Sequence, residues 1–173
     1  MVNLFQCIQS LSFRRSELDK ILLNSKMKYL LTILVFTLLI IIILNRENKL
    51  LTEIKKRYNI LMNAIQFHEK YSDLYHKRSI ITGLKRKEDT IAYNINKGYE
   101  IYIAIDNESD INSAMYVLLH EIAHTTVPEY DHSPNFWQNF KELRQIATDA
   151  NLYVPVKNSK YCGQNITDYL SAQ

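Results

Sequence analysis

The longest run of hydrophobic positions lies near the N-terminus, from Tyr29 to Leu44, and contains no charged side chain. A helix of this length spans roughly 24 Å, and flanking basic residues such as Lys28 and Arg46 can extend it toward the roughly 30 Å of a bilayer core. The pattern predicts a single-pass transmembrane helix over 29–45, behind an N-terminal segment of residues 1–28. Basic residues are equally frequent on the two sides, so the positive-inside rule selects neither orientation.

Residues 46–78 place hydrophobic side chains at three- and four-residue steps, at Leu51, Ile54, Tyr58, Leu61, Ile65 and His68. This spacing is typical of an amphipathic helix that buries one face. The face has two interpretations. It packs against the domain that follows, or it forms a membrane-proximal coiled coil that joins two copies of the chain through residues 50–68.

Alternating hydrophobic and polar positions indicate strands in residues 79–105, at the start of a domain that spans 79–173. The runs Ile91–Ile95 and Tyr99–Ile105 flank Asn96-Lys97-Gly98, which is a hairpin signal. The second run places its isoleucines on one face. We therefore predict a small β-meander.

Two helical patterns follow the strands. Residues 111–126 carry an apolar stripe and end before Pro128, because the residue before a proline is pushed out of helical geometry. Ser133 and Pro134 have the form of an N-cap and a first helical residue, and they start a second helix over 134–150. Its hydrophobic face consists of Phe136, Phe140, Leu143 and Ala147. The predicted fold class is therefore α+β.

Charge and cysteine content limit the functions that suit this chain. The net charge is +3, and the basic and acidic residues that precede Tyr29 account for all of it. Residues 46–173 carry 16 basic and 16 acidic side chains, and a neutral domain disfavours nucleic-acid binding. Cys7 and Cys162 lie on opposite sides of the predicted membrane helix, so the sequence holds no disulfide framework, and we expect Cys162 to be buried.

The strongest chemical signal is His120-Glu121-Ile122-Ala123-His124, which reads H-E-x-x-H inside the first helical pattern. His120 and His124 lie four residues apart, so a helix places both on one face, where two imidazoles can bind one Zn²⁺. Glu121 lies beside them as a candidate general base. The apolar stripe of Ile111, Ala114, Leu118 and Ile122 faces away from the histidines, toward a core.

A catalytic zinc site needs a third protein ligand and an open position for water. The nearest candidate is His132, placed just before the start of the second helix. Glu142 is the main alternative, because some zincins use a glutamate on a following helix as the third ligand. Asp131 is a weaker alternative, or a partner that orients a ligand histidine.

The motif followed by His132-Ser133-Pro134-Asn135-Phe136-Trp137 resembles the H-E-x-x-H…H-[DS]-x-x-F-W signature of WLM-type zinc metallopeptidases, which are related to the SprT-like group. The stretches Thr82–Arg86, Ala92–Asn94, Asn96–Glu100 and Tyr161–Gln164 resemble a branch of these proteins encoded by large DNA viruses. The likeness covers residues 78–168, roughly half of the chain. The spacer between His124 and His132 is longer than in most of the family.

The resemblance implies a zincin-like metallopeptidase fold that binds zinc through His120, His124 and His132 and uses Glu121 as the base. It also implies that a strand beside the active-site helix offers its edge to an extended substrate, and Tyr99–Ile105 is the candidate for that strand. The location that it implies is a host or virion membrane.

These features predict a membrane-anchored, zinc-dependent metallopeptidase that hydrolyses peptide bonds of a protein or peptide substrate. Tyr116, Tyr130 and Tyr161 are candidates for stabilising the oxyanion. The alternative is a non-catalytic, zinc-stabilised structural or interaction module of a virion membrane. Glu121 argues against that alternative, because a purely structural zinc site has no use for a base. Proteolysis of proteins linked to DNA, as in the wider family, is disfavoured by the neutral charge of the domain.

Overall fold

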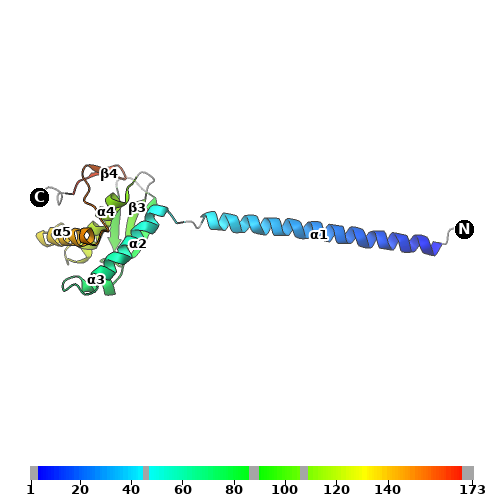
Figure 1. The fold of residues 1–173 in the computed structure, drawn as a ribbon, viewed down its shortest axis with the longest axis horizontal. Helices are drawn as coiled ribbons and strands as arrows, with labels where there is room; N and C mark the ends of the chain where they lie inside the picture. Colours follow the sequence, from blue (N-terminus) through cyan, green and yellow to red (C-terminus); the bar gives the residue numbers. More distant parts are fainter. Residues whose placement is uncertain (1–3, 45–46, 86–89, 106–108, 169–173) are drawn as a thin grey trace. The chain divides into compact units, whose positions relative to one another are not determined.

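The computed structural model describes residues 4–44, 47–85, 90–105 and 109–168. The chain divides into two compact units, Met1–Arg46 and Glu47–Gln173, and each is described by itself. Helix α1 (Leu4–Leu44) makes up the first unit and continues without a break through the expected border at residue 28 (Figure 1).

Within α1, the segment Leu23–Ile43 is long and apolar enough to cross a membrane. Its 21 residues span roughly 31 Å as a helix, which matches the thickness of a bilayer core. None of the segment is buried by the rest of the protein. The apolar helix predicted for this region is therefore present, and it starts before residue 29 because Lys26 and Lys28 do not interrupt helical geometry.

Helix α2 (Lys49–Ala64) opens the second unit, and the side chain of its N-cap, Asn48, accepts a hydrogen bond from the Leu50 amide. The predicted hydrophobic face is buried in the core of this unit, at Leu51, Ile54, Tyr58 and Leu61, and Ile65 just past the helix end is buried too. Packing within the domain is thus the correct interpretation. The fully buried side chains of this face cannot also contact a second chain, and a dimer through other positions of residues 50–68 stays a prediction. A short helix, α3 (Ser72–His76), follows.

The sheet consists of β1 (Ile80–Lys85), β2 (Ala92–Ile95) and β3 (Glu100–Ile105), in the order β1-β3-β2. β2 and β3 form the predicted antiparallel hairpin, but β1 runs parallel to β3. The β-meander prediction is therefore wrong. The physical reason is burial: β3 holds the fully buried Ile101 and Ile103 and takes the centre, where it has a partner on each side.

The central place of β3 also corrects the candidate for the substrate edge. β1 pairs with residues 100–105 on one edge and β2 with residues 100–103 on the other, so this segment cannot receive an added strand there. β2 lies at the margin of the sheet and pairs with β3 alone in the described part of the chain.

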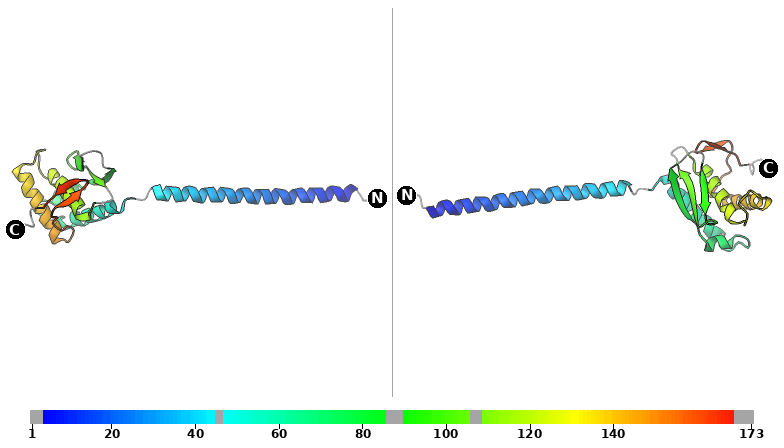
Figure 2. Two further views of the ribbon diagram at one scale, coloured as in Figure 1. Left: turned by 90° about the horizontal axis from the view of Figure 1, so that it is seen from above. Right: turned by 180° about the vertical axis from the view of Figure 1, so that it is seen from behind.

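Helices α4 (Ile111–Thr125) and α5 (Pro134–Asp149) confirm both helical predictions. Asp110 caps α4 and Ser133 caps α5, each through a side-chain oxygen that accepts from backbone amides of the first turn. Both helices lie on one side of the sheet, together with α2 (Figure 2). A second hairpin, β4 (Ser159–Tyr161) and β5 (Gln164–Ile166), completes a mixed α+β unit.

Candidate metal centre

Helix α4 presents three polar side chains at its C-terminal half. His120 and His124 lie one turn apart with ring centroids 4.9 Å from each other, and Glu121 lies next to them with 7% of its surface exposed. The opposite side of the helix carries Leu118 and Ile122, which are buried in the core. The amphipathic pattern therefore fixes the direction of the two histidines, as the sequence predicted.

His132 joins these histidines. The chain leaves α4 at Thr126, loops through residues 127–132 and enters α5 at its cap. This loop brings the His132 Nε2 atom to 3.1 Å from the His120 Nε2 atom, and the ligand atoms of all three histidines lie within 4.8 Å of one another. The Phe136 ring contacts all three imidazoles, with ring centroids 4.3 to 5.0 Å apart, and packs against the cluster.

The donor set suits zinc. Two nitrogens bound to one tetrahedral zinc lie roughly 3.3 Å apart, close to the separation of the His120 and His132 nitrogens. Burial, followed by the charges of His124 and His132, lowers the pKa of His120 to about 4. Burial also lowers the pKa of His124. Both rings are therefore neutral at pH 7, which is the form that binds a metal ion.

The two alternatives for the third ligand lie outside the cluster. Glu142 accepts hydrogen bonds from the Lys70 ammonium at 2.7 Å and the Tyr71 hydroxyl at 2.6 Å, and these bonds lower its pKa to about 2. The glutamate thus connects α5 to the segment that precedes α3, and the structure favours His132 over this alternative as the third ligand. Asp131 is exposed, and it is not a member of the cluster that His120, His124 and His132 form.

Glu121 has a partner that sequence reasoning missed. The Asn94 side chain on β2 donates a hydrogen bond to Glu121 Oε2 at 3.0 Å. Burial raises the pKa of Glu121, and this hydrogen bond opposes part of the rise. The sequence gives no local signal for the pair, because 27 residues separate its members and the sheet order brings them together.

Lys97 in the β2–β3 turn holds the loop that carries His132. Its ammonium donates to the carbonyls of Pro128, at 2.7 Å, and Glu129, at 3.0 Å, and lies over the Tyr130 ring. The next residue, Gly98, packs closely against Thr125 at the end of α4. The hairpin signal in the sequence thus also positions the third histidine.

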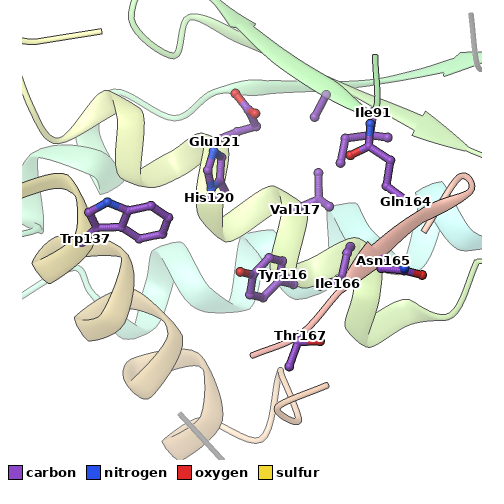
Figure 3. Close-up of a pocket in the computed structure, with 11 residues that line it drawn as sticks. Ile91, Tyr116, Val117, His120, Glu121, Trp137, Gln164, Asn165, Ile166 and Thr167 are labelled. Atoms are coloured by element: carbon purple, nitrogen blue, oxygen red, sulfur yellow. The ribbon is translucent and has the colours of Figure 1, made fainter. Parts of the chain in front are cut away.

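A cleft of about 650 Å³ opens beside His120 and Glu121 (Figure 3). Trp137 and Tyr116 border it on the helical side, and Gln164 to Thr167 form the wall on the side of β5. A second cavity of about 260 Å³ also has Glu121 in its lining, with Asn94, Lys97 and His124 among others. Glu121 and Ala92 therefore border both cavities.

The three tyrosines that are candidates for stabilising the oxyanion lie in different places in the structure. Tyr161 is fully buried and its hydroxyl donates to the Ala104 carbonyl, so this candidate is wrong. Tyr116 lines the cleft near His120. Tyr130 is 86% exposed and lines the second cavity. Cys162, as expected, is buried, and it contacts the same carbonyl as Tyr161.

Comparisons with known proteins find relatives in viruses. "Uncharacterized protein R325" of Acanthamoeba polyphaga mimivirus is 35% identical over 88 residues, which cover 46% of this chain and 45% of that protein. "Uncharacterized protein 136R" of Invertebrate iridescent virus 6 is 33% identical over 98 residues, which cover 51% of this chain and 54% of that protein. The chain thus spans about half the length of the curated relatives it matches. No family model and no solved structure matches. The chain is similar to proteins of two viruses over about half of its length.

Proposed function

We propose that this chain is a membrane-anchored, zinc-dependent metallopeptidase with a zincin-like, WLM-type catalytic domain. The observation that carries the proposal is the cluster of three imidazoles beside one buried carboxylate, where His120 and Glu121 line a cleft. His120, His124 and His132 would hold the metal, and three protein ligands leave the fourth position that a catalytic zinc needs. The apolar segment Leu23–Ile43 would anchor the domain in a host or virion membrane.

Bound zinc supplies Lewis-acid chemistry, which activates water and polarises the scissile carbonyl. Glu121 accepts the proton that the attacking water loses and passes it to the leaving amine. The Asn94 amide donates to Oε2 of Glu121, which leaves Oε1 as the oxygen proposed to take the proton. The Tyr116 hydroxyl is the candidate donor to the developing oxyanion on the cleft side.

The substrate would bind along β2. This strand lies at the edge of the sheet, lines both cavities and carries Asn94, whose side chain donates to Glu121. An extended peptide that adds to this edge passes the carboxylate, and main-chain hydrogen bonds give such binding its affinity. β2 therefore replaces Tyr99–Ile105 as the proposed substrate strand.

The test is the substitution Glu121→Gln in the full-length chain, purified in detergent. The variant should keep zinc, because the three histidines are intact, and lose peptidase turnover by a factor on the order of 10³. Glu69→Gln, an exposed glutamate outside both cavities, is the control and should keep full activity. Equal activity in Glu121→Gln and the unsubstituted chain would remove Glu121 from the mechanism.

The alternative of a purely structural zinc module finds less support. A structural site closes the fourth position with another protein ligand, usually cysteine. Among the described residues, the cluster around His120 holds three histidines and no fourth ligand. Cys162, the cysteine of the second unit, is buried against Ala104 and is not a member of the cluster.

A further inference from the structure

The cleft beside Glu121 has a composition that bears on substrate choice. At about 650 Å³ it falls in the range of cavities that enclose whole small molecules. Its surface is hydrophobic over Ile91, Val117 and Ile166, and two aromatic rings, Tyr116 and Trp137, border it. The rest of the lining consists of small or amide side chains. Apart from His120 and Glu121 of the metal centre, none of the described residues that line the cleft carries a charge.

The wall opposite α4 is fixed at both ends. Near the β4–β5 turn, the Tyr161 hydroxyl donates to the Ala104 carbonyl of the sheet. Beyond β5, the buried Asp168 accepts hydrogen bonds from the Arg144 guanidinium and the Tyr153 hydroxyl. Buried groups whose hydrogen bonds are all formed hold a segment rigidly. The β4–β5 side of the cavity is therefore held in place before a substrate binds.

Arg144 does not supply a charge to the cavity. Its guanidinium is buried behind Tyr116, 5.8 Å from the ring, and is paired with Asp168. Away from the metal centre, between Val117 and Ile166, a substrate carboxylate or ammonium would thus lose its water without a partner of opposite charge among the described lining residues. Burying such a group without a partner is unfavourable, whereas a hydrophobic side chain gains from burial.

We propose that this cavity selects the residue beside the scissile bond, and that it takes a large uncharged side chain, either aromatic or long and aliphatic. The inference rests on the proposed peptidase function, since it assigns the substrate class of the same site. The side chain enters between Val117 and Ile166, while Trp137 contacts it from α5. Gln164 and Asn165 at the rim suit the peptide groups on either side.

Trp137 allows a test that does not need turnover, because it is the single tryptophan of the chain and borders the cavity. The full-length Glu121→Gln variant is loaded with zinc in detergent and titrated with four peptides. The peptides share one uncharged sequence and differ at a single position, which is Phe, Leu, Lys or Asp. The Phe and Leu peptides should change the tryptophan fluorescence and bind on the order of 100-fold more tightly than the charged peptides. Equal or tighter binding of the Lys or Asp peptide overturns the inference.

A charge placed on the rim gives the matched test. Gln164→Glu adds one negative charge at the cavity, and Lys49→Gln makes the same change of charge at the exposed start of α2, outside the lining. Affinity for the Lys peptide should rise by about tenfold in Gln164→Glu and stay unchanged in Lys49→Gln, because a charge interaction acts over a short range. The same gain in both variants, or in neither, contradicts the assignment of this cavity.

Cleavage of the same four peptides by the unsubstituted chain separates the two proposals. Selective binding of the Phe and Leu peptides without cleavage of any peptide refutes the peptidase function and leaves a cavity with the stated preference. Cleavage that is equally fast for Phe and for Asp or Lys refutes the preference and leaves the peptidase function in place.

Discussion

At the scale of single residues, Asn94 controls the state of the proposed base. Its amide is the hydrogen-bond donor that opposes the rise in the pKa of Glu121 caused by burial. Asn94→Leu removes that donor, so the pKa of Glu121 rises further and the ionised base is lost at a higher pH. We expect the acidic limb of the pH profile of kcat/KM to move up by roughly one unit, the equivalent of one hydrogen bond. An acidic limb that stays in place would show that Asn94 does not act on Glu121.

Glu142 gives a stability prediction at the same scale. Hydrogen bonds from Lys70 and then Tyr71 lower its pKa from 4.5 to about 2 in the folded chain. A carboxyl whose pKa is lowered by folding stabilises the protein above its unfolded pKa, and the contribution disappears as the pH falls from 4.5 toward 2. Glu142→Gln should thus cost about 1 kcal/mol at pH 7, since the pair is partly exposed and screened, and much less near pH 2.

Denaturant unfolding at the two pH values checks this prediction, and elemental analysis of the same variant checks the ligand assignment. Glu142→Gln should keep its zinc, because Glu142 lies outside the histidine cluster. Loss of zinc in this variant would return Glu142 to the list of ligands.

The residues that sequence predicts and those that it misses differ in one respect. His120, Glu121 and His124 follow from helical spacing, and His132 follows from its place just before a helix cap, so local rules suffice for all four. Asn94 reaches the site only through the order of the strands, and no local rule predicts such a contact.

At the scale of elements, the β2–β3 turn should be sensitive to substitution. A Cβ atom on Gly98 would lie 2.3 Å from Cγ2 of Thr125, and the residue has a φ of +89°. Gly98→Ala should therefore destabilise the chain by about 2 kcal/mol or more, from the left-handed backbone and the close contact together. Gly163→Ala is the control, since Gly163 has a φ of 79° in an exposed turn. Equal losses in urea unfolding would mean that the approach to α4 is not tight.

The elements themselves were predictable where one periodicity dominates. The helices α2, α4 and α5 follow from hydrophobic spacing and, for α5, also from the cap Ser133. The strand order was not predictable, because the alternation in β3 shows which face is buried but not which strands pair with it. The hairpin β4–β5 was missed too, since its strands are three residues long and its turn uses Cys162 and Gly163, which are not the usual pair.

At the scale of the whole molecule, the two units predict a protein held at a membrane through one helix. The large hydrophobic side chains of the segment Leu23–Ile43 are exposed, which a helix in water would not favour. The full chain should remain with membranes after an alkaline wash, and a chain that lacks residues 1–46 should be released. Release of the full chain by the same wash would contradict the anchor.

The central claim is that three histidines form one zinc site, and zinc content tests it most directly. Elemental analysis of the full-length chain, purified in detergent without chelator, should give one zinc per chain. His132→Ala should lose most of it, because only two ligands from α4 remain. A folded chain without zinc, or a His132→Ala variant that holds zinc as firmly as the unsubstituted chain, would contradict the account.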